Sequence, residues 1–143
     1  MQSFEKGRWV WYNCLKMVLF DYLICNEDRH GGNWGLQHGR VTPLFDHNIA
    51  FGGDTSPVDA EFFFANLTFP FYLISEHAQN ADKLVAFVLS ENPTYKVLLA
   101  EWVALLEQVS LPDIAEPSLQ SDVQSINKLF QRRLAYVLRT QLS

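Results

Sequence analysis

A helical pattern of apolar residues runs from residue 7 to residue 25 and stops abruptly at Cys25-Asn26. The residues that carry its spacing are Trp11, Leu15, Val18, Leu19, Tyr22 and Leu23. A stripe of this kind is typical of an amphipathic helix that buries one face. Polar residues and then Gly31-Gly32 follow at once, and such residues end helices. The sequence therefore predicts a helix over residues 7–25 that leads directly into an irregular polar segment.

The next predicted element is a β-hairpin in the stretch WGLQHGRVTPLF. Two short apolar runs flank His38-Gly39, and a two-residue loop with glycine second fits a primed hairpin turn. Pairing the strands around that loop sets Gln37 opposite Arg40 and Leu36 opposite Val41. We expect a hairpin in this register.

The rest of the chain predicts helices. Asn80 is a candidate cap for a helix over residues 81–90, and Asn92-Pro93 is a favourable start for the next. Ser121 and Gln124 have the spacing of a capping box that opens a final helix after the loop SLPDIAEPS. The apolar stripe of the penultimate helix is Tyr95, Leu98, Leu99, Trp102, Leu105, Leu106 and Val109. That of the final helix is Val123, Ile126, Phe130, Leu134, Val137 and Leu138.

These elements predict a mainly α protein with one β-hairpin, an α+β domain that spans residues 1–143. The hairpin and the polar loop before it occupy residues 23–52, and the helical remainder occupies residues 58–142. With 48% hydrophobic and 19% charged residues, the chain has enough apolar side chains for one core. The aromatic stretch FFFANLTFPFYLI fits either the core or an exposed contact surface.

Charge and hydropathy limit the classes of partner. A formal net charge of −5 argues against direct binding to nucleic acid, which usually requires a basic footprint. No apolar stretch approaches the roughly 20 residues that span a bilayer, so we expect no membrane span. Cys14 and Cys25, on one predicted helix, are too far apart to form a disulfide, and two reduced thiols are typical of a cytoplasmic protein.

Three polar side chains converge at the open end of the predicted hairpin. Continuing the register brings Asn33 opposite Leu44, and Asp46 then lies on the same side as Asn33. Asp28 comes five residues before Asn33, across a loop whose glycines permit a tight return. Each of these residues alone also fits an ordinary Asx turn, but together they form an oxygen-only site. Such a site suits Mg²⁺ carried with a nucleotide phosphate.

The same stretch resembles a known family. Residues 26–33, NEDRHGGN, followed by residues 42–46, TPLFD, resemble the N-x-D-x-H-x-x-N and P-x-(Y/F)-D motifs of HipA-like serine/threonine kinases. Phosphoinositide lipid kinases share a similar D-R-H-x-x-N, so the motif marks the wider kinase-like superfamily. The close resemblance covers roughly residues 18–52, and it implies the C-terminal catalytic lobe of a kinase.

The resemblance implies a role for each matching residue. Asp28 corresponds to the catalytic aspartate and His30 to a supporting residue of the active loop. Asn33 and Asp46 correspond to ligands of the Mg²⁺ that accompanies ATP, and Asn26 to a brace for the loop. The implied reaction is phosphorylation of a hydroxyl, most typically of protein Ser or Thr, and some family members are toxins controlled by an antitoxin partner.

The chain departs from the family before the motif. Kinases of this superfamily cover the phosphates with an N-terminal lobe that carries a glycine-rich loop and a strand lysine. Here the motif begins at residue 26, Lys6 has no strand pattern around it, and neither G-x-G-x-x-G nor G-x-x-x-x-G-K-[ST] occurs. We therefore expect a lobe that is incomplete alone, with the N-lobe supplied by an upstream segment or a separate chain.

Two other function classes remain open. One is a non-catalytic kinase-like module that binds a nucleotide or a protein. The other is a metal-dependent phosphohydrolase that uses Asp28-x-His30 and Asp46-His47 as ligands, although His77 is the only later histidine. The sequence does not identify the phosphoacceptor, the oligomeric state or an antitoxin pairing.

Overall fold

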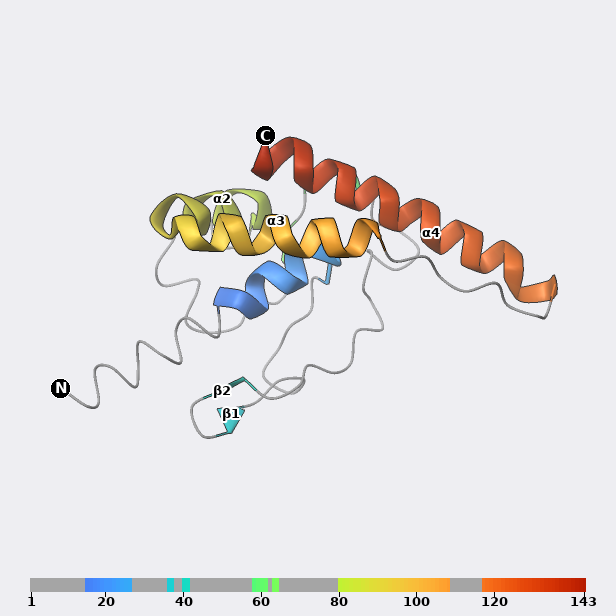
Figure 1. Ribbon diagram of the computed structural model, residues 1–143, viewed down its shortest axis with the longest axis horizontal. Coiled ribbons are helices and arrows are strands. Elements are labelled where there is room, and N and C mark those ends of the chain that lie inside the picture. The colour runs from blue at the N-terminus through green and yellow to red at the C-terminus, as the bar shows by residue number, and fades with distance from the viewer. Residues whose placement is uncertain are drawn as a thin grey trace.

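The computed structural model is mainly helical (Figure 1). It describes residues 15–26, 36–37, 40–41, 58–61, 63–64, 80–108 and 117–143. For residues 36–37, 40–41, 117–119 and 121–123 the description covers the backbone alone. The elements are a helix at residues 15–23, β1 (Leu36–Gln37), β2 (Arg40–Val41), α2 (Ala81–Glu91), α3 (Pro93–Glu107), α4 (Pro117–Val137) and the π-helical turn η3 (Leu138–Leu142).

The first helix agrees with its predicted stripe. Of the predicted apolar residues, those that the structure describes are all at most 4% exposed: Leu15, Val18, Leu19, Tyr22 and Leu23. The helix ends at residue 23, and residues 24 and 25 form a turn, so the predicted end at Cys25-Asn26 is confirmed to within two residues. The predicted beginning at residue 7 lies outside the described residues.

Helices α2 and α3 begin where the sequence predicts. The Asn80 side chain accepts a hydrogen bond of 3.2 Å from the Lys83 amide, which caps α2. Pro93 opens α3 after Asn92. The Asn92 side chain, however, makes no capping bond to α3 and instead donates to the Val88 carbonyl of α2 at 3.5 Å. Asn92 therefore serves both as the C-terminal cap residue of α2 and as the position that precedes α3.

The final helix begins earlier than predicted. The helix α4 already starts at Pro117, so the expected capping box of Ser121 and Gln124 is wrong, because Ser121 lies inside the helix. Proline fixes φ near the helical value and lacks an amide proton, which suits the first position of a helix. At the other end, the helical path continues beyond Val137 through η3.

A single apolar cluster joins the helices. The helix at residues 15–23, α2, α3 and α4 all contribute fully buried side chains, such as Leu19, Leu84, Leu99 and Val137. Figure 1 shows α2 and α3 side by side, with the C-terminal end of the chain reaching them through α4 and η3. The fold therefore sets the helix that leads into the motif against the three helices that follow it.

Two stripe predictions are wrong in part. In α3, Leu105 is 61% exposed, while Val103 is buried. In the final helix, Ile126 of α4 and Leu138 of η3 are exposed, whereas Arg133 and Tyr136 of α4 are buried. The other described residues of both stripes are buried or partly buried. Arg133 and Tyr136 are buried because they hydrogen-bond to the first helix and to α2.

Candidate functional site

The helix that precedes the motif ends in a Schellman turn. The Asn26 amide donates to the Asp21 carbonyl at 2.8 Å, and the Cys25 amide donates to the Tyr22 carbonyl at 3.3 Å. These two bonds satisfy carbonyls that a helix C-terminus otherwise leaves without a partner inside the helix. The chain thus leaves the helix at Asn26, the first residue of the candidate motif, in a fixed direction.

Cys25 occupies the left-handed position of this turn, with a φ of 53°. Glycine is the usual residue there, because a Cβ in this region costs about 1 kcal/mol or more. The side chain of Cys25 is only 1% exposed, so its burial in the core compensates for that cost. Cys14 lies outside the described residues, so the expectation that Cys14 and Cys25 form no disulfide stays a prediction.

The side chain of Asn26 is fully buried beside the helix it follows. Its Nδ2 donates to the Asp21 carboxylate at 3.2 Å, and both residues are at most 2% exposed. A buried amide and a buried carboxylate are stabilised only when they are hydrogen-bonded, so the pair fixes Asn26 to the end of the helix. The candidate motif therefore begins from a rigid point.

The hairpin within the motif has the register that the sequence predicts. β1 and β2 are antiparallel, with Leu36 opposite Val41 and Gln37 opposite Arg40. The predicted site residues flank this pair along the chain. Asp28, His30, Asn33 and Asp46 lie outside the described residues, so their convergence stays a prediction.

A second polar cluster was not predicted from the sequence. The Asp82 carboxylate, in the first turn of α2, accepts hydrogen bonds from the Tyr22 hydroxyl at 2.8 Å and the Tyr136 hydroxyl at 2.9 Å. Gln141 of η3 donates to the Tyr22 hydroxyl at 3.2 Å and to the Asp82 carbonyl at 3.0 Å. Four elements thus meet at Asp82, three of them through its carboxylate and η3 through its backbone carbonyl.

The protonation of this cluster follows from its burial. Burial, with a smaller contribution from the nearby Asp82 carboxylate, raises the pKa of the Tyr22 hydroxyl to about 12. Burial and the hydrogen bond to Asp82 also raise the pKa of Tyr136 well above its usual value. Both hydroxyls therefore stay protonated donors at neutral pH, and the cluster acts as a structural link between helices.

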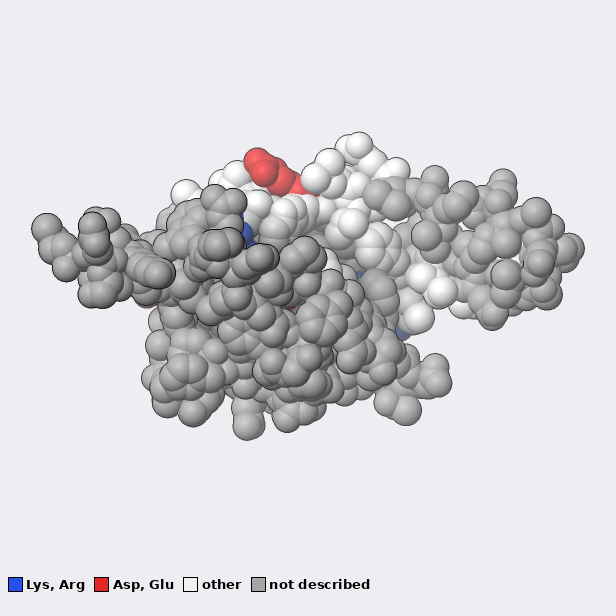
Figure 2. Space-filling model, turned by 90° about the horizontal axis from the view of Figure 1, so that it is seen from below, with Lys and Arg blue, Asp and Glu red and all other residues white. Residues whose placement is uncertain are grey.

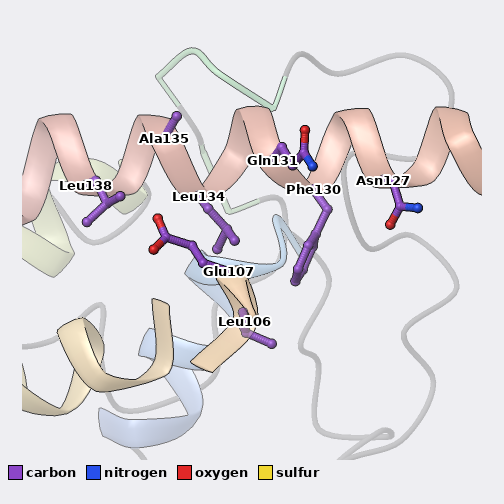
Figure 3. Close-up of a pocket in the computed structure, with 8 residues that line it drawn as sticks. All are labelled: Leu106, Glu107, Asn127, Phe130, Gln131, Leu134, Ala135 and Leu138. Atoms are coloured by element: carbon purple, nitrogen blue, oxygen red, sulfur yellow. The ribbon is translucent and has the colours of Figure 1, made fainter. Parts of the chain in front are cut away.

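A hollow of about 170 Å³ lies between the end of α3 and α4 (Figure 3). Phe130 and Leu134 point from α4 toward Leu106 of α3, and Glu107 lines the same space. The lining residues that the structure describes combine this one carboxylate with amides and apolar side chains, and they include no histidine or second carboxylate. Among the described residues, moreover, no three His, Cys, Asp or Glu side chains group as a metal site.

The described residues add three observations. In Figure 2 the described part of the face is mostly uncharged, with acidic side chains gathered at one edge and little basic surface. Within the described ranges, no helix is both long and apolar enough to cross a membrane. In the aromatic stretch, Phe64 is buried and Phe63 is 53% exposed, so these two neighbours divide between core and surface.

Comparisons with known proteins assign no family. No family model, curated protein or solved structure matches this chain.

Proposed function

We propose that this chain is a kinase-like catalytic lobe that binds Mg²⁺-ATP and transfers its γ-phosphoryl group to a hydroxyl, most typically of protein Ser or Thr. The observation that carries the proposal is the hairpin register. Leu36 pairs with Val41, and the same register continued three pairs outward sets Asn33 opposite Leu44, with Asp46 on the same side. The observed pairing supports the register from which the sequence spacing predicts this site.

Each proposed residue has a chemical task. Asn33 and Asp46 would hold the Mg²⁺ that accompanies ATP, because carboxylate and amide oxygens suit this ion, and the ion would offset the negative charge of the phosphates. Asp28 accepts the proton of the acceptor hydroxyl as its oxygen bonds to the γ-phosphorus. The bond from that phosphorus to the β-phosphate oxygen breaks, and ADP leaves with the electron pair. His30 supports the loop that carries Asp28.

The anchored end of the motif supports this assignment. Asn26 is held by its backbone bond to Asp21 and by its side-chain bond to the Asp21 carboxylate. Asp28 follows it by only two residues. Groups that orient a substrate must be held within a fraction of an ångström, so a rigid start for the catalytic loop favours catalysis. An Asn in this position therefore acts as the brace that the motif implies.

A second candidate function is a non-catalytic module that binds a nucleotide or a protein. It is favoured by the absence of a glycine-rich phosphate loop from the 143 residues. We propose that nucleotide binding is a property of this chain, and that turnover requires a phosphate-covering lobe from elsewhere. A protein substrate and an antitoxin-like partner belong to the same proposal.

Calorimetric titration with Mg²⁺-ATP tests the proposal. Wild type should bind, and Asp46→Ala and Asn33→Ala should weaken binding by more than about tenfold, since each removes a metal ligand. Asp28→Ala should bind like wild type but transfer no phosphoryl group when an N-lobe is supplied. Asp59→Ala is the matched control, because that carboxylate is exposed and bound to Arg132. Equal binding by wild type and Asp46→Ala, or none by either, contradicts the metal site.

A further inference from the structure

Arg133 of α4 is a fully buried arginine that contacts two distant parts of the chain. Its Nε donates to the Tyr22 carbonyl at 3.2 Å, and its Nη2 donates to the same oxygen. Its Nη1 donates to the Val58 carbonyl at 3.0 Å. One guanidinium therefore connects the end of the first helix to the turn at residues 58–60.

The position of this guanidinium is fixed from several sides. Its central carbon lies 4.5 Å from the centre of the Tyr22 ring and 5.3 Å from that of Tyr136. A buried cation is costly unless its donors are satisfied, and the planar fork of arginine can serve two carbonyls in different directions. A lysine ammonium, which is a single point charge, cannot reproduce that arrangement.

The two carbonyls mark the two ends of the segment that carries the motif. Tyr22 precedes Asn26 by four residues, and its carbonyl also accepts the Cys25 amide of the Schellman turn. Val58 follows Asp46 by twelve residues. Every residue of the proposed site lies in the chain between these two contacts. A brace at the ends of a loop reduces the conformations open to the loop.

We propose that Arg133 is a positioning residue, which holds together the two ends of the motif-bearing segment and so sets its affinity for Mg²⁺-nucleotide. The part of this inference that concerns the ligand rests on the proposed function. The part that concerns the brace rests only on the contacts of Arg133. The two parts can be measured separately.

Hydrogen exchange tests the brace without any ligand. In Arg133→Met the Cys25 amide should exchange about tenfold faster or more, because its acceptor, the Tyr22 carbonyl, loses the guanidinium that fixes it. The Asn26 amide should follow, because it belongs to the same turn. Amides in the middle of α3 should keep their protection. Arg139→Met is the control, since it removes the same charge from a residue whose guanidinium lies over the Tyr136 ring. Unchanged exchange at Cys25 and Asn26 in Arg133→Met overturns the brace.

Titration with Mg²⁺-ATP tests the link to the site, at a temperature where each variant is folded. Arg133→Met should bind about tenfold more weakly than wild type, and Arg139→Met should bind equally well. If Arg133 is purely structural, Arg133→Met lowers the unfolding midpoint and leaves the affinity of the folded protein for Mg²⁺-ATP unchanged. That result overturns the positioning role. Arg133→Lys should give an intermediate affinity, and it decides the question if Arg133→Met fails to fold. If wild type itself does not bind, the proposed function fails, and hydrogen exchange alone decides the brace.

Discussion

Replacing Asp82 with Ala removes the acceptor that two tyrosine hydroxyls share. Tyr22 of the first helix and Tyr136 of α4 both donate to Oδ1 of Asp82, at 2.8 Å and 2.9 Å. Because Asp82 lies in α2, the variant removes a polar link among three helices. The loss should therefore exceed that of a single surface hydrogen bond.

The magnitude follows from the two bonds. A hydrogen bond to a charged group contributes about 1.5–3 kcal/mol, and the lower value applies here because the cluster is only partly buried. Two such bonds give a loss of about 3 kcal/mol in the free energy of unfolding. For a domain of this size that corresponds to a fall in the melting temperature of roughly 6–12 °C. Asp82→Asn, which keeps one neutral acceptor oxygen, should lose less.

Urea unfolding followed by circular dichroism measures these values. Asp82 also lies in the first turn of α2, where a carboxylate interacts favourably with the helix dipole, so a double-mutant cycle is needed. Asp82→Ala should couple with Tyr22→Phe and with Tyr136→Phe by about 1 kcal/mol or more each. A loss below about 1 kcal/mol in Asp82→Ala, or coupling energies near zero, would refute the reasoning.

Three further predictions concern the same region. The pKa of Tyr22 is about 12 in the folded state, against an ordinary value of 10.0. The contribution of its protonated hydroxyl to the free energy of unfolding is therefore full below pH 10 and is lost between pH 10 and pH 12. Alkaline titration of stability should show this loss, of up to about 3 kcal/mol, and Tyr22→Phe should flatten the curve. Asn26→Ala should lower the free energy of unfolding by about 1–2 kcal/mol. Asn26→Asp sets a second carboxylate beside Asp21, so it should be more destabilising at pH 8 than at pH 5. Equal losses at both pH values would count against this geometry. Asp59→Asn should leave the urea midpoint of unfolding unchanged, since the ion pair of Asp59 with Arg132 is exposed. A clear shift of that midpoint would show that the pair is not screened by solvent.

Local chemistry made much of the helical framework predictable. Asn80 caps α2 and Pro93 opens α3, because capping side chains and proline act on the backbone within a few residues. The hairpin register followed from loop length and a single glycine. The end of the first helix was predictable from the polar residues that follow it, although the left-handed residue is Cys25 rather than glycine.

Long-range polar contacts could not be predicted in this way. Hydrophobic spacing indicates which face of α4 is apolar, but it gives no reason for Arg133 and Tyr136 to be buried. Arg133 bonds to the carbonyls of Tyr22 and Val58, and Tyr136 bonds to the Asp82 carboxylate, all of which are more than fifty residues away in sequence. The same limit applies to the candidate site. The motif predicts which residues meet, and Asp28, Asn33 and Asp46 lie outside the described part of the chain.

We propose that this chain binds a nucleotide through a metal ion held by Asn33 and Asp46. The most direct test is titration of ATP into wild-type protein in the presence of Mg²⁺ and again with EDTA in place of the metal. We expect ATP to bind in the presence of Mg²⁺ and its affinity to fall by more than about tenfold in EDTA, because the polyphosphate then faces carboxylates without a cation between them. Equal affinity under the two conditions would contradict it.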